Sequence, residues 1–181
     1  DWVEVPSHLR AHADRLHAVG GISRLSPREG VKRDPNHVVV MAGLGGSTWS
    51  PEDWEAVQRA CPEYRFTFLG GDNHVDDPTE LLQSAGIAVT AGGQNSVADL
   101  AATDTPAVIL PQPRPFTEQK AGAKALEGLA TVRNAFPAPE EWPELLRRRD
   151  TDWRRWQTDG AARRAAEVIA GVAADPGQPA T

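Results

Sequence analysis

The chain has 181 residues, of which 40% are hydrophobic, and a mean hydropathy of -0.45, values typical of a globular protein large enough to enclose a core. Its net charge of -6 and pI of about 5.4 argue against nonspecific binding to nucleic acid or to an anionic membrane. A single cysteine, Cys61, excludes an internal disulfide framework and suits a reducing cytoplasm. No stretch approaches the roughly 18 apolar residues that cross a bilayer.

Residues 1–36 show no clear hydrophobic period, although Ile22–Leu25 could form a short strand. His8 and His12 are four residues apart, but no acidic or cysteine ligand is spaced to complete a metal site, so we expect solvated histidines. The only methionine, Met41, lies within a predicted strand, which suggests a fragment of a longer polypeptide. We expect a lead-in segment over 1–36, one domain over 37–173 and a flexible tail over 174–181.

The first half of that domain alternates strands and helices. Apolar residues at 37–42 predict a buried strand, which a glycine-rich loop at 43–48 follows. Ser50, Pro51 and two acidic residues then predict a capped helix that runs to about Cys61 and buries Trp54 and Val57. A second strand is expected at 64–69, and a short helix at 80–85, capped by Asp77 or Thr79.

The loop at 43–48 partly matches the dinucleotide fingerprint. Gly43 and Gly45 have the right spacing, but Thr48 stands where a third glycine or alanine belongs. Asp72 could serve as the ribose-binding acid only at a stretched distance. NAD binding is therefore the weaker interpretation of this loop.

Residues 86–110 predict a βαβ unit of a parallel sheet. The apolar strand at 87–90 ends in Ala91-Gly92-Gly93, a helix over 94–102 follows, and a strand at 107–110 is closed by Pro111. Free N–H groups in the first turn of that helix, Gly93-Gln94-Asn95-Ser96, would favour an anion such as a phosphate. Asp99 lies one turn further on, placed to meet a pair of hydroxyls. The alternative is a helix with a polar first turn and a surface aspartate.

The last third of the chain predicts helices around one more strand. A helix is expected at 118–128, a weak strand at 130–134, and amphipathic helical structure over 137–173 with a break near Gly160. The arginines at 147–149 and 154–155 could touch acidic lipids, although a solvated helix face is the better interpretation. Asp150 and Asp152 have the form of a metal–nucleotide motif but are expected to cap a helix.

The glycine turns at 43–48 and 91–96 and the helix that begins at Glu118 should meet at the carboxyl edge of one sheet, where open α/β folds bind ligands. This order of motifs resembles the C-terminal, donor-binding half of GT-B glycosyltransferases, particularly family 28, which includes the peptidoglycan GlcNAc transferase. The resemblance covers about residues 37–130. It implies an α/β fold with a Rossmann-like parallel sheet flanked by helices, followed by C-terminal helices.

Several short motifs carry the resemblance and imply roles. Gly45-Gly46-Ser47 is similar to the family's first phosphate-side loop, and Gly93-Gln94-Asn95-Ser96-Val97-Ala98-Asp99 to its Gly-x-x-Thr-x-x-Glu motif. By this resemblance Gly45, Gly46, Ser47, Gly93, Gln94, Asn95 and Ser96 would hold the donor diphosphate. Asp99 would bind the ribose, Val75 the base through its backbone, and Glu118 with Gln119 the donor sugar. The sequence departs from the family pattern at Ala91, which replaces an Arg or His, at the shorter Asp99, and at Gly122, which replaces an Asn.

The resemblance implies a domain that binds a nucleoside-diphosphate sugar, with UDP as the expected carrier, in a metal-independent inverting glycosyltransferase without a cofactor. The acceptor site and general base would lie on an N-terminal domain, in the same or a separate chain. The arginine-rich composition suggests a bacterial source, and we expect a cytoplasmic protein, with weak peripheral membrane association in the full enzyme. The alternatives are a sugar-nucleotide epimerase or hydrolase of the same fold, and a non-catalytic nucleotide-binding or interaction module.

Overall fold

The computed structural model describes residues 7–41, 48–71, 73–112 and 118–174, with the side chains of 7–10 and 118–121 excepted. Five parallel strands form one sheet in the order β2-β1-β3-β4-β5. Their bounds are Asp34–Met41 (β1), Arg65–Leu69 (β2), Ala85–Thr90 (β3), Ala107–Ile109 (β4) and Thr131–Val132 (β5). The five strands expected between residues 37 and 134 are present, and β5 is shorter than expected.

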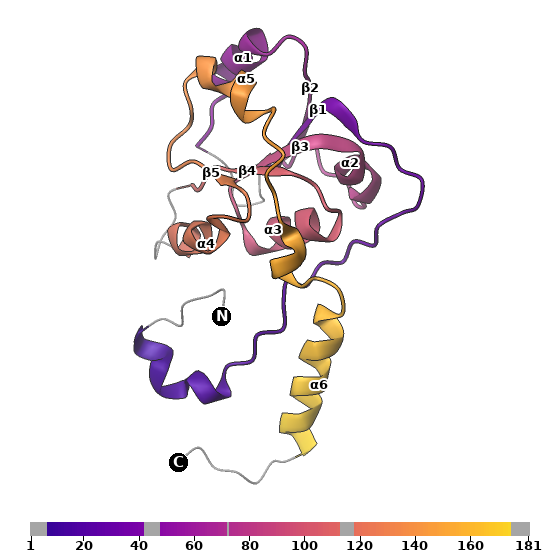
Figure 1. Ribbon diagram of the computed structural model, residues 1–181, viewed down its shortest axis with the longest axis vertical. Helices are drawn as coiled ribbons and strands as arrows, with labels where there is room; N and C mark the ends of the chain where they lie inside the picture. The colour runs from indigo at the N-terminus through magenta and orange to yellow at the C-terminus, as the bar shows by residue number, and fades with distance from the viewer. Residues whose placement is uncertain (1–6, 42–47, 72, 113–117, 175–181) are drawn as a thin grey trace.

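Helices cover both faces of this sheet, as the continuous apolar character of the strands requires (Figure 1). On one face, Val38, Val40 and Val89 pack against α1 (Pro51–Ala60) and α5 (Trp142–Leu145). On the other face, Val39 and Ile109 pack against α2 (Thr79–Ser84), α3 (Gln94–Ala102), α4 (Glu118–Leu126) and the 3₁₀ helix η4 (Trp153–Trp156). The molecule is therefore a three-layer α/β domain of the Rossmann-like type.

Helix α1 begins where the sequence predicted a cap. The Ser50 hydroxyl accepts a hydrogen bond from the Asp53 amide at 3.1 Å, and the Asp53 carboxylate accepts one from the Ser50 amide at 2.9 Å. Trp54, Val57 and Cys61 are buried, as predicted for one face of this helix. This reciprocal cap satisfies two backbone N–H groups that the helix itself cannot pair.

The expected helical stretch over 137–173 is more broken than the sequence suggested. The 3₁₀ helix η3 (Pro139–Glu141) leads directly into α5, which ends at Leu145. The 3₁₀ helix η4 begins at Trp153, and α6 (Ala161–Ala174) begins only after Gly160. The reason is that Trp142 belongs to the core on one face of the sheet and Trp153 to the core on the other. The chain between them must pass around the sheet edge, where Thr151 accepts a hydrogen bond from the Ala107 amide at 3.3 Å, and a continuous helix could not make that passage.

The lead-in segment does not form a strand at Ile22–Leu25. After the 3₁₀ helix η1 (Ser7–Arg15), the chain runs without regular structure to residue 33 along the outside of α3 and α2 (Figure 1). Ser23 contacts Asp99 on α3, and the Arg28 amide donates to Gln83 on α2 at 2.8 Å. Because this path crosses helices, the segment meets no unpaired strand edge with which it could pair. It is nonetheless anchored, since Leu25 is buried in the core.

Helix α6 projects from the body of the domain (Figure 1). Its Ile169 and Val172 are 69% and 68% exposed, while Ala161, at its start, is buried.

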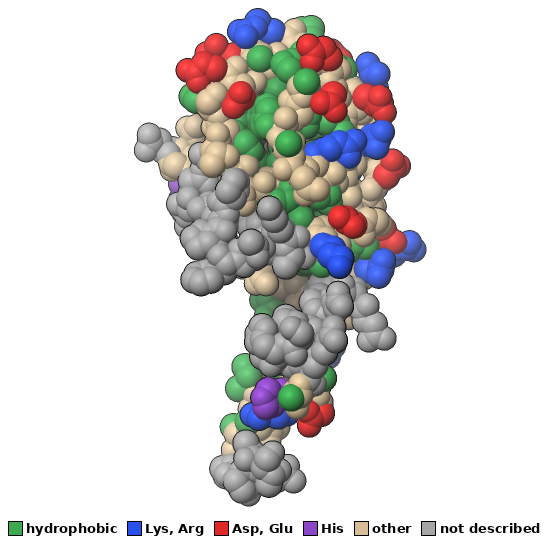
Figure 2. All heavy atoms as spheres, turned by 90° about the vertical axis from the view of Figure 1, so that its left-hand side faces the viewer, with side chains coloured by type: hydrophobic (Ala, Val, Ile, Leu, Met, Phe, Trp, Pro, Cys, Tyr) green, Lys and Arg blue, Asp and Glu red, His purple; other side chains and the backbone are tan. Residues whose placement is uncertain are grey.

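Figure 2 shows the body from the side, where acidic and basic side chains are interspersed on the visible face. Within the described residues, no helix is long and apolar enough to cross a membrane.

Candidate functional site

The strand order reverses at β1 and β3, and the carboxyl ends of these two strands form the candidate site. These strands are neighbours in the centre of the sheet, and the helices that follow them, α1 and α3, lie on opposite faces. In open α/β folds, ligands bind at the carboxyl ends of neighbouring strands whose helices diverge in this way.

The turn after β3 has the backbone conformation that its glycines allow. Thr90, the last residue of β3, is buried, and its hydroxyl accepts a long hydrogen bond of 3.4 Å from the Gly92 amide. Gly92 has a φ of +81°, a conformation that side-chain-bearing residues rarely adopt. This turn directs the chain abruptly from the buried strand into α3, whose first residue is Gln94.

The first turn of α3 is open and carries no acidic side chain. Gly93 is the N-cap residue, and no side chain caps the helix. Gln94 and Asn95 are exposed and Ser96 is partly exposed, while Val97 and the residues that follow on the inner face are buried. The helix thus presents backbone N–H groups, its positive dipole end and three polar side chains at the sheet edge, an arrangement that favours an anion.

Asp99, one turn further along α3, is partly exposed and already has one partner. Its Oδ1 atom accepts a 2.6 Å hydrogen bond from the Ser23 hydroxyl, and the Ser23 oxygen in turn accepts one of 3.0 Å from the Leu25 amide. The lead-in segment therefore fixes the orientation of the Asp99 carboxylate. A carboxylate has about four lone-pair positions, so Asp99 can accept further hydrogen bonds from a ligand hydroxyl.

The loop after β2 lies on the same side of the sheet and contains Val75, which is 40% exposed. The Arg24 guanidinium donates to the Asp76 carbonyl, so the lead-in segment contacts this loop directly after it contacts Asp99. Asp77 accepts hydrogen bonds from the Thr79 amide at 3.0 Å and from the Thr79 hydroxyl. The N-cap residue of α2 is Pro78, without a side-chain cap, so neither Asp77 nor Thr79 is the expected cap. The Thr79 hydrogen bonds, followed by the charge of Arg28, lower the pKa of Asp77.

Thr48, which precedes α1, is hydrogen-bonded to Gln112, which follows β4. Gln112 is buried, and its Oε1 atom accepts a 2.8 Å hydrogen bond from the Thr48 amide and a second bond from the Thr48 hydroxyl. Gln112 thereby links Thr48 to the carboxyl end of β4.

The remaining residues expected at the site fall partly outside the described structure. Gly45, Gly46 and Ser47 lie outside the described residues. Glu118 and Gln119 are the first residues of α4, as expected, but their side chains also lie outside the described part.

Sequence reasoning missed three side chains at this edge, namely Ser23, Arg24 and Gln112. Ser23 and Arg24 were assigned to a lead-in segment, and the 76 positions between Ser23 and Asp99 leave no local pattern that could reveal their contact. Gln112 offered a detectable signal, because a polar residue that follows a buried parallel strand lies at the carboxyl edge of its sheet.

The metal-like motifs have structural explanations where the structure describes them. Asp152 caps η4 by accepting from the Arg154 amide, and the Arg154 side chain forms an ion pair with it at 2.8 Å. This hydrogen-bonded arginine lowers the pKa of Asp152 to about 2. Across the described residues, no group of three or more His, Cys, Asp or Glu side chains is placed to hold a metal ion.

No protein-family model matches the chain, and no curated protein is significantly similar to it in sequence. Solved structures, however, are similar in fold. The glycosyltransferase of kitacinnamycin matches 91% of this chain and 52% of its own with a TM-score of 0.58 and 20% identity. The calicheamicin glycosyltransferase CalG4 matches 87% of this chain and 45% of its own with a TM-score of 0.57 and 21% identity.

This chain therefore has the fold of one half of a GT-B glycosyltransferase, consistent with the C-terminal half. It spans about half the length of the solved structures that it matches.

Proposed function

We propose that this chain is the donor-binding half of a metal-independent inverting glycosyltransferase and that it binds a nucleoside-diphosphate sugar, with UDP as the expected carrier. The observation that carries the proposal is the uncapped start of α3 beside the partly exposed Asp99 carboxylate, on the helix that follows β3 at the carboxyl edge of the sheet. The fold shared with two glycosyltransferases supports it.

In this proposal the ligand extends along the carboxyl edge of the sheet. The diphosphate lies at the first turn of α3, where Gly93, Gln94, Asn95 and Ser96 offer N–H groups and polar side chains, with Gly45, Gly46 and Ser47 closing it from the loop after β1. Asp99 accepts hydrogen bonds from the ribose hydroxyls. The base lies against Val75 and its loop, and Glu118 with Gln119 bind the sugar.

The chemistry follows from what the site can stabilise. An acceptor hydroxyl attacks the anomeric carbon and gives its proton to the general base. A new carbon–oxygen bond forms as the bond from that carbon to the diphosphate oxygen breaks with inversion. The departing nucleoside diphosphate takes up negative charge. The α3 dipole and the backbone N–H groups oppose that charge most directly, and need no metal for it.

The acceptor site and the general base belong in this proposal to a separate N-terminal domain, in the same polypeptide or in a partner chain. Residues 1–181 alone should then bind the donor but transfer little or no sugar. That expectation separates the proposal from an epimerase or hydrolase of the same fold, which would convert a nucleotide sugar without any acceptor.

Calorimetric titration of the chain with UDP, dTDP, GDP and NAD, with magnesium and with a chelator, tests the proposal. We expect one nucleoside diphosphate to bind with the same affinity in both conditions. Binding of NAD alone would contradict it, as would silence with all four ligands at millimolar concentration, the result that a non-catalytic interaction module would give. Release of free UDP or a converted sugar from UDP-sugars without acceptor would favour the hydrolase or epimerase.

A further inference from the structure

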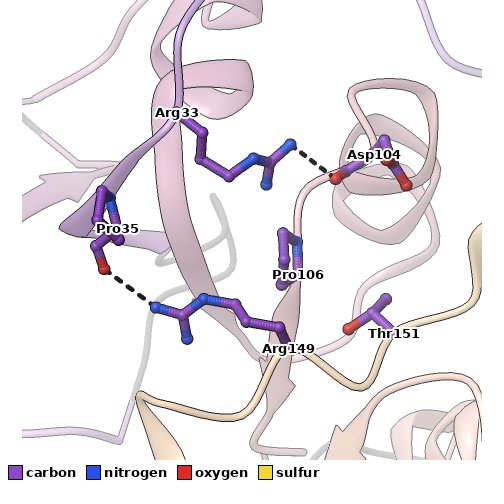
Figure 3. Close-up of a pocket in the computed structure, with 6 residues that line it drawn as sticks. All are labelled: Arg33, Pro35, Asp104, Pro106, Arg149 and Thr151. Atoms are coloured by element: carbon purple, nitrogen blue, oxygen red, sulfur yellow. Dashed lines mark hydrogen bonds between the residues drawn. The ribbon is translucent and has the colours of Figure 1, made fainter.

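A cavity lies at the edge of the sheet where the strands begin, opposite the proposed donor site (Figure 3). It has a volume of about 510 Å³. Its walls come from the start of β1, the turns that precede β4, and the segment that joins α5 to η4. The lining residues are Arg33, Pro35, Asp104, Pro106, Arg149 and Thr151.

Two arginine side chains enter this cavity and are held in place by backbone carbonyl groups. Arg33 donates to the Ala85 carbonyl at 3.2 Å and to the Asp104 carbonyl at 2.8 Å. Arg149 donates to the Pro35 carbonyl at 3.0 Å and to carbonyls of its own segment, including that of Leu146. Each guanidinium has five N–H donors, so both groups keep donors free after these bonds while their positions are fixed.

The acceptors of these hydrogen bonds are neutral, so the two positive charges are only partly balanced. No described carboxylate forms a salt bridge with Arg33 or Arg149 within 4.0 Å. The nearest acidic influence on Arg33 is Asp104, which favours its charged form. Burial acts more strongly and lowers the pKa of Arg33, and the charge of Arg149 lowers it further. An anion between the two guanidinium groups would relieve both effects.

Thr151 adds a hydroxyl group to the same wall. Its oxygen accepts the Ala107 amide hydrogen at 3.3 Å, which leaves its own O–H hydrogen able to donate toward the cavity. The site therefore offers two planar forks of N–H donors and one hydroxyl donor. Arginine forks match the geometry of phosphate oxygens, and a doubly charged phosphate monoester would balance both arginines.

We propose that this pocket between Arg33 and Arg149 binds a phosphate-bearing small molecule that is distinct from the nucleotide donor. The cavity exceeds what a phosphate ion needs, so it leaves space for an organic group next to Pro35 and Pro106. Strand β3, with 6 residues, separates this edge from the start of α3. At about 3.3 Å per residue that separation is about 20 Å, too far for one phosphate group to contact both sites.

The test is a titration of the chain with inorganic phosphate, followed by NMR of the backbone amide groups. We expect saturable shifts of residues 33, 104–105, 107 and 149–151. Arg33→Gln and Arg149→Gln should each weaken phosphate binding about tenfold, because each removes one charge-assisted pair of hydrogen bonds. Arg155→Gln is the matched control, since Arg155 is exposed and does not line the cavity, and it should leave the affinity unchanged.

Arg33→Lys keeps the charge but removes the fork, and should bind more weakly than the natural protein and more tightly than Arg33→Gln. Shifts of residues 92–96 alone would place phosphate at the proposed donor site and overturn the inference, as would an absence of saturable shifts at the arginine pocket. This mapping on the unaltered chain decides the question even if Arg149→Gln fails to fold. Binding to vesicles of phosphatidylglycerol, compared with vesicles of phosphatidylcholine, distinguishes a lipid headgroup from a free phosphate ester as the source of the phosphate. If the source is a headgroup, the chain should bind the phosphatidylglycerol vesicles, and Arg33→Gln should weaken that binding.

Discussion

Asp99 is the residue on which the proposed donor site depends most. The Ser23 hydroxyl holds its Oδ1 atom at 2.6 Å, so the carboxylate is oriented before any ligand arrives. A ligand that uses an oriented carboxylate loses less conformational freedom on binding. Ser23 thus acts as a positioning residue, and Asp99 as the group that would touch the ribose.

Replacing Asp99 with alanine should lower the affinity for the nucleoside diphosphate about 10-fold to 100-fold, the range expected when charged hydrogen bonds to a ligand are lost. Ser23→Ala should cause a smaller loss, because the carboxylate remains. Calorimetry measures both. Glu127→Ala is the control, since Glu127 is exposed beyond the far end of α4. Equal affinities for all four proteins would remove Asp99 from the site.

His37 gives the domain a dependence on pH. It is 1% exposed, its Nε2 atom lies 2.9 Å from the Thr67 hydroxyl oxygen, and its Nδ1 atom has no hydrogen-bond partner in the described structure. Burial, assisted by the charge of Arg65, lowers the pKa of His37 below its usual value of 6.5. The unfolded chain therefore binds a proton at a higher pH than the folded chain does.

Above pH 6.5 His37 is neutral in both the folded and the unfolded chain, so its titration does not affect the free energy of unfolding. As the pH falls from 6.5 toward the lower folded-state pKa, only the unfolded chain gains the proton, and the free energy of unfolding decreases. Urea unfolding at pH 7.5 and at pH 5.5 should show a loss of stability for the natural protein. His37→Leu should show a smaller loss between the same two conditions. An equal loss in both proteins would show that other groups cause the acid sensitivity.

Among the elements, the turn between β3 and α3 matters both for the stability of the fold and for the proposed donor site. It must end a buried strand and expose the first turn of the helix within three residues, Ala91, Gly92 and Gly93. Only Gly92 is in the left-handed region, and an added Cβ there would lie 2.8 Å from Cγ2 of Ile109. Gly93 has an ordinary φ of -61°, and an added Cβ there would meet nothing within 4 Å.

Gly92→Ala should therefore lower the free energy of unfolding by about 1–3 kcal/mol, the usual cost of a strained backbone conformation. Gly93→Ala should change stability by less than about 0.5 kcal/mol, as substitutions at open positions do. Chemical denaturation of the two variants measures both free energies of unfolding, and the two variants carry the same glycine-to-alanine change at adjacent positions. Similar losses for both would show that the turn is not constrained as described.

At the scale of the whole molecule, the sequence predicted the elements well and their long-range contacts poorly. The five strands are short apolar runs bounded by glycine, proline or polar residues, and Ser50 with Pro51 marked the start of α1, so local chemistry sufficed there. The contact of Ser23 with Asp99 and that of Arg149 with Pro35 join residues 76 and 114 positions apart. These contacts form only through tertiary packing, and no local hydrophobic period in the sequence predicts them.

The same reason explains the errors in the second half of the chain. The amphipathic pattern at 137–173 did predict helices, but it could not show that Trp142 and Trp153 pack on opposite faces of the sheet. Packing on opposite faces requires a break in the helical structure at residues 146–152, and this break also forms part of the arginine pocket. The sequence therefore predicted neither the break nor the pocket. The ligand-binding roles assigned to all the predicted site residues stay predictions.

The most direct test of the donor-binding account is NMR of the backbone amide groups during titration with the nucleoside diphosphate that binds in calorimetry, UDP being the expected one. The account predicts the largest shifts at residues 92–96, at Asp99 and Ser23, and in the loop that contains Val75, with the amides of residues 33 and 149–151 affected less. Saturable shifts confined to the amino edge of the sheet, or spread without preference over the surface, would contradict a donor site at the start of α3.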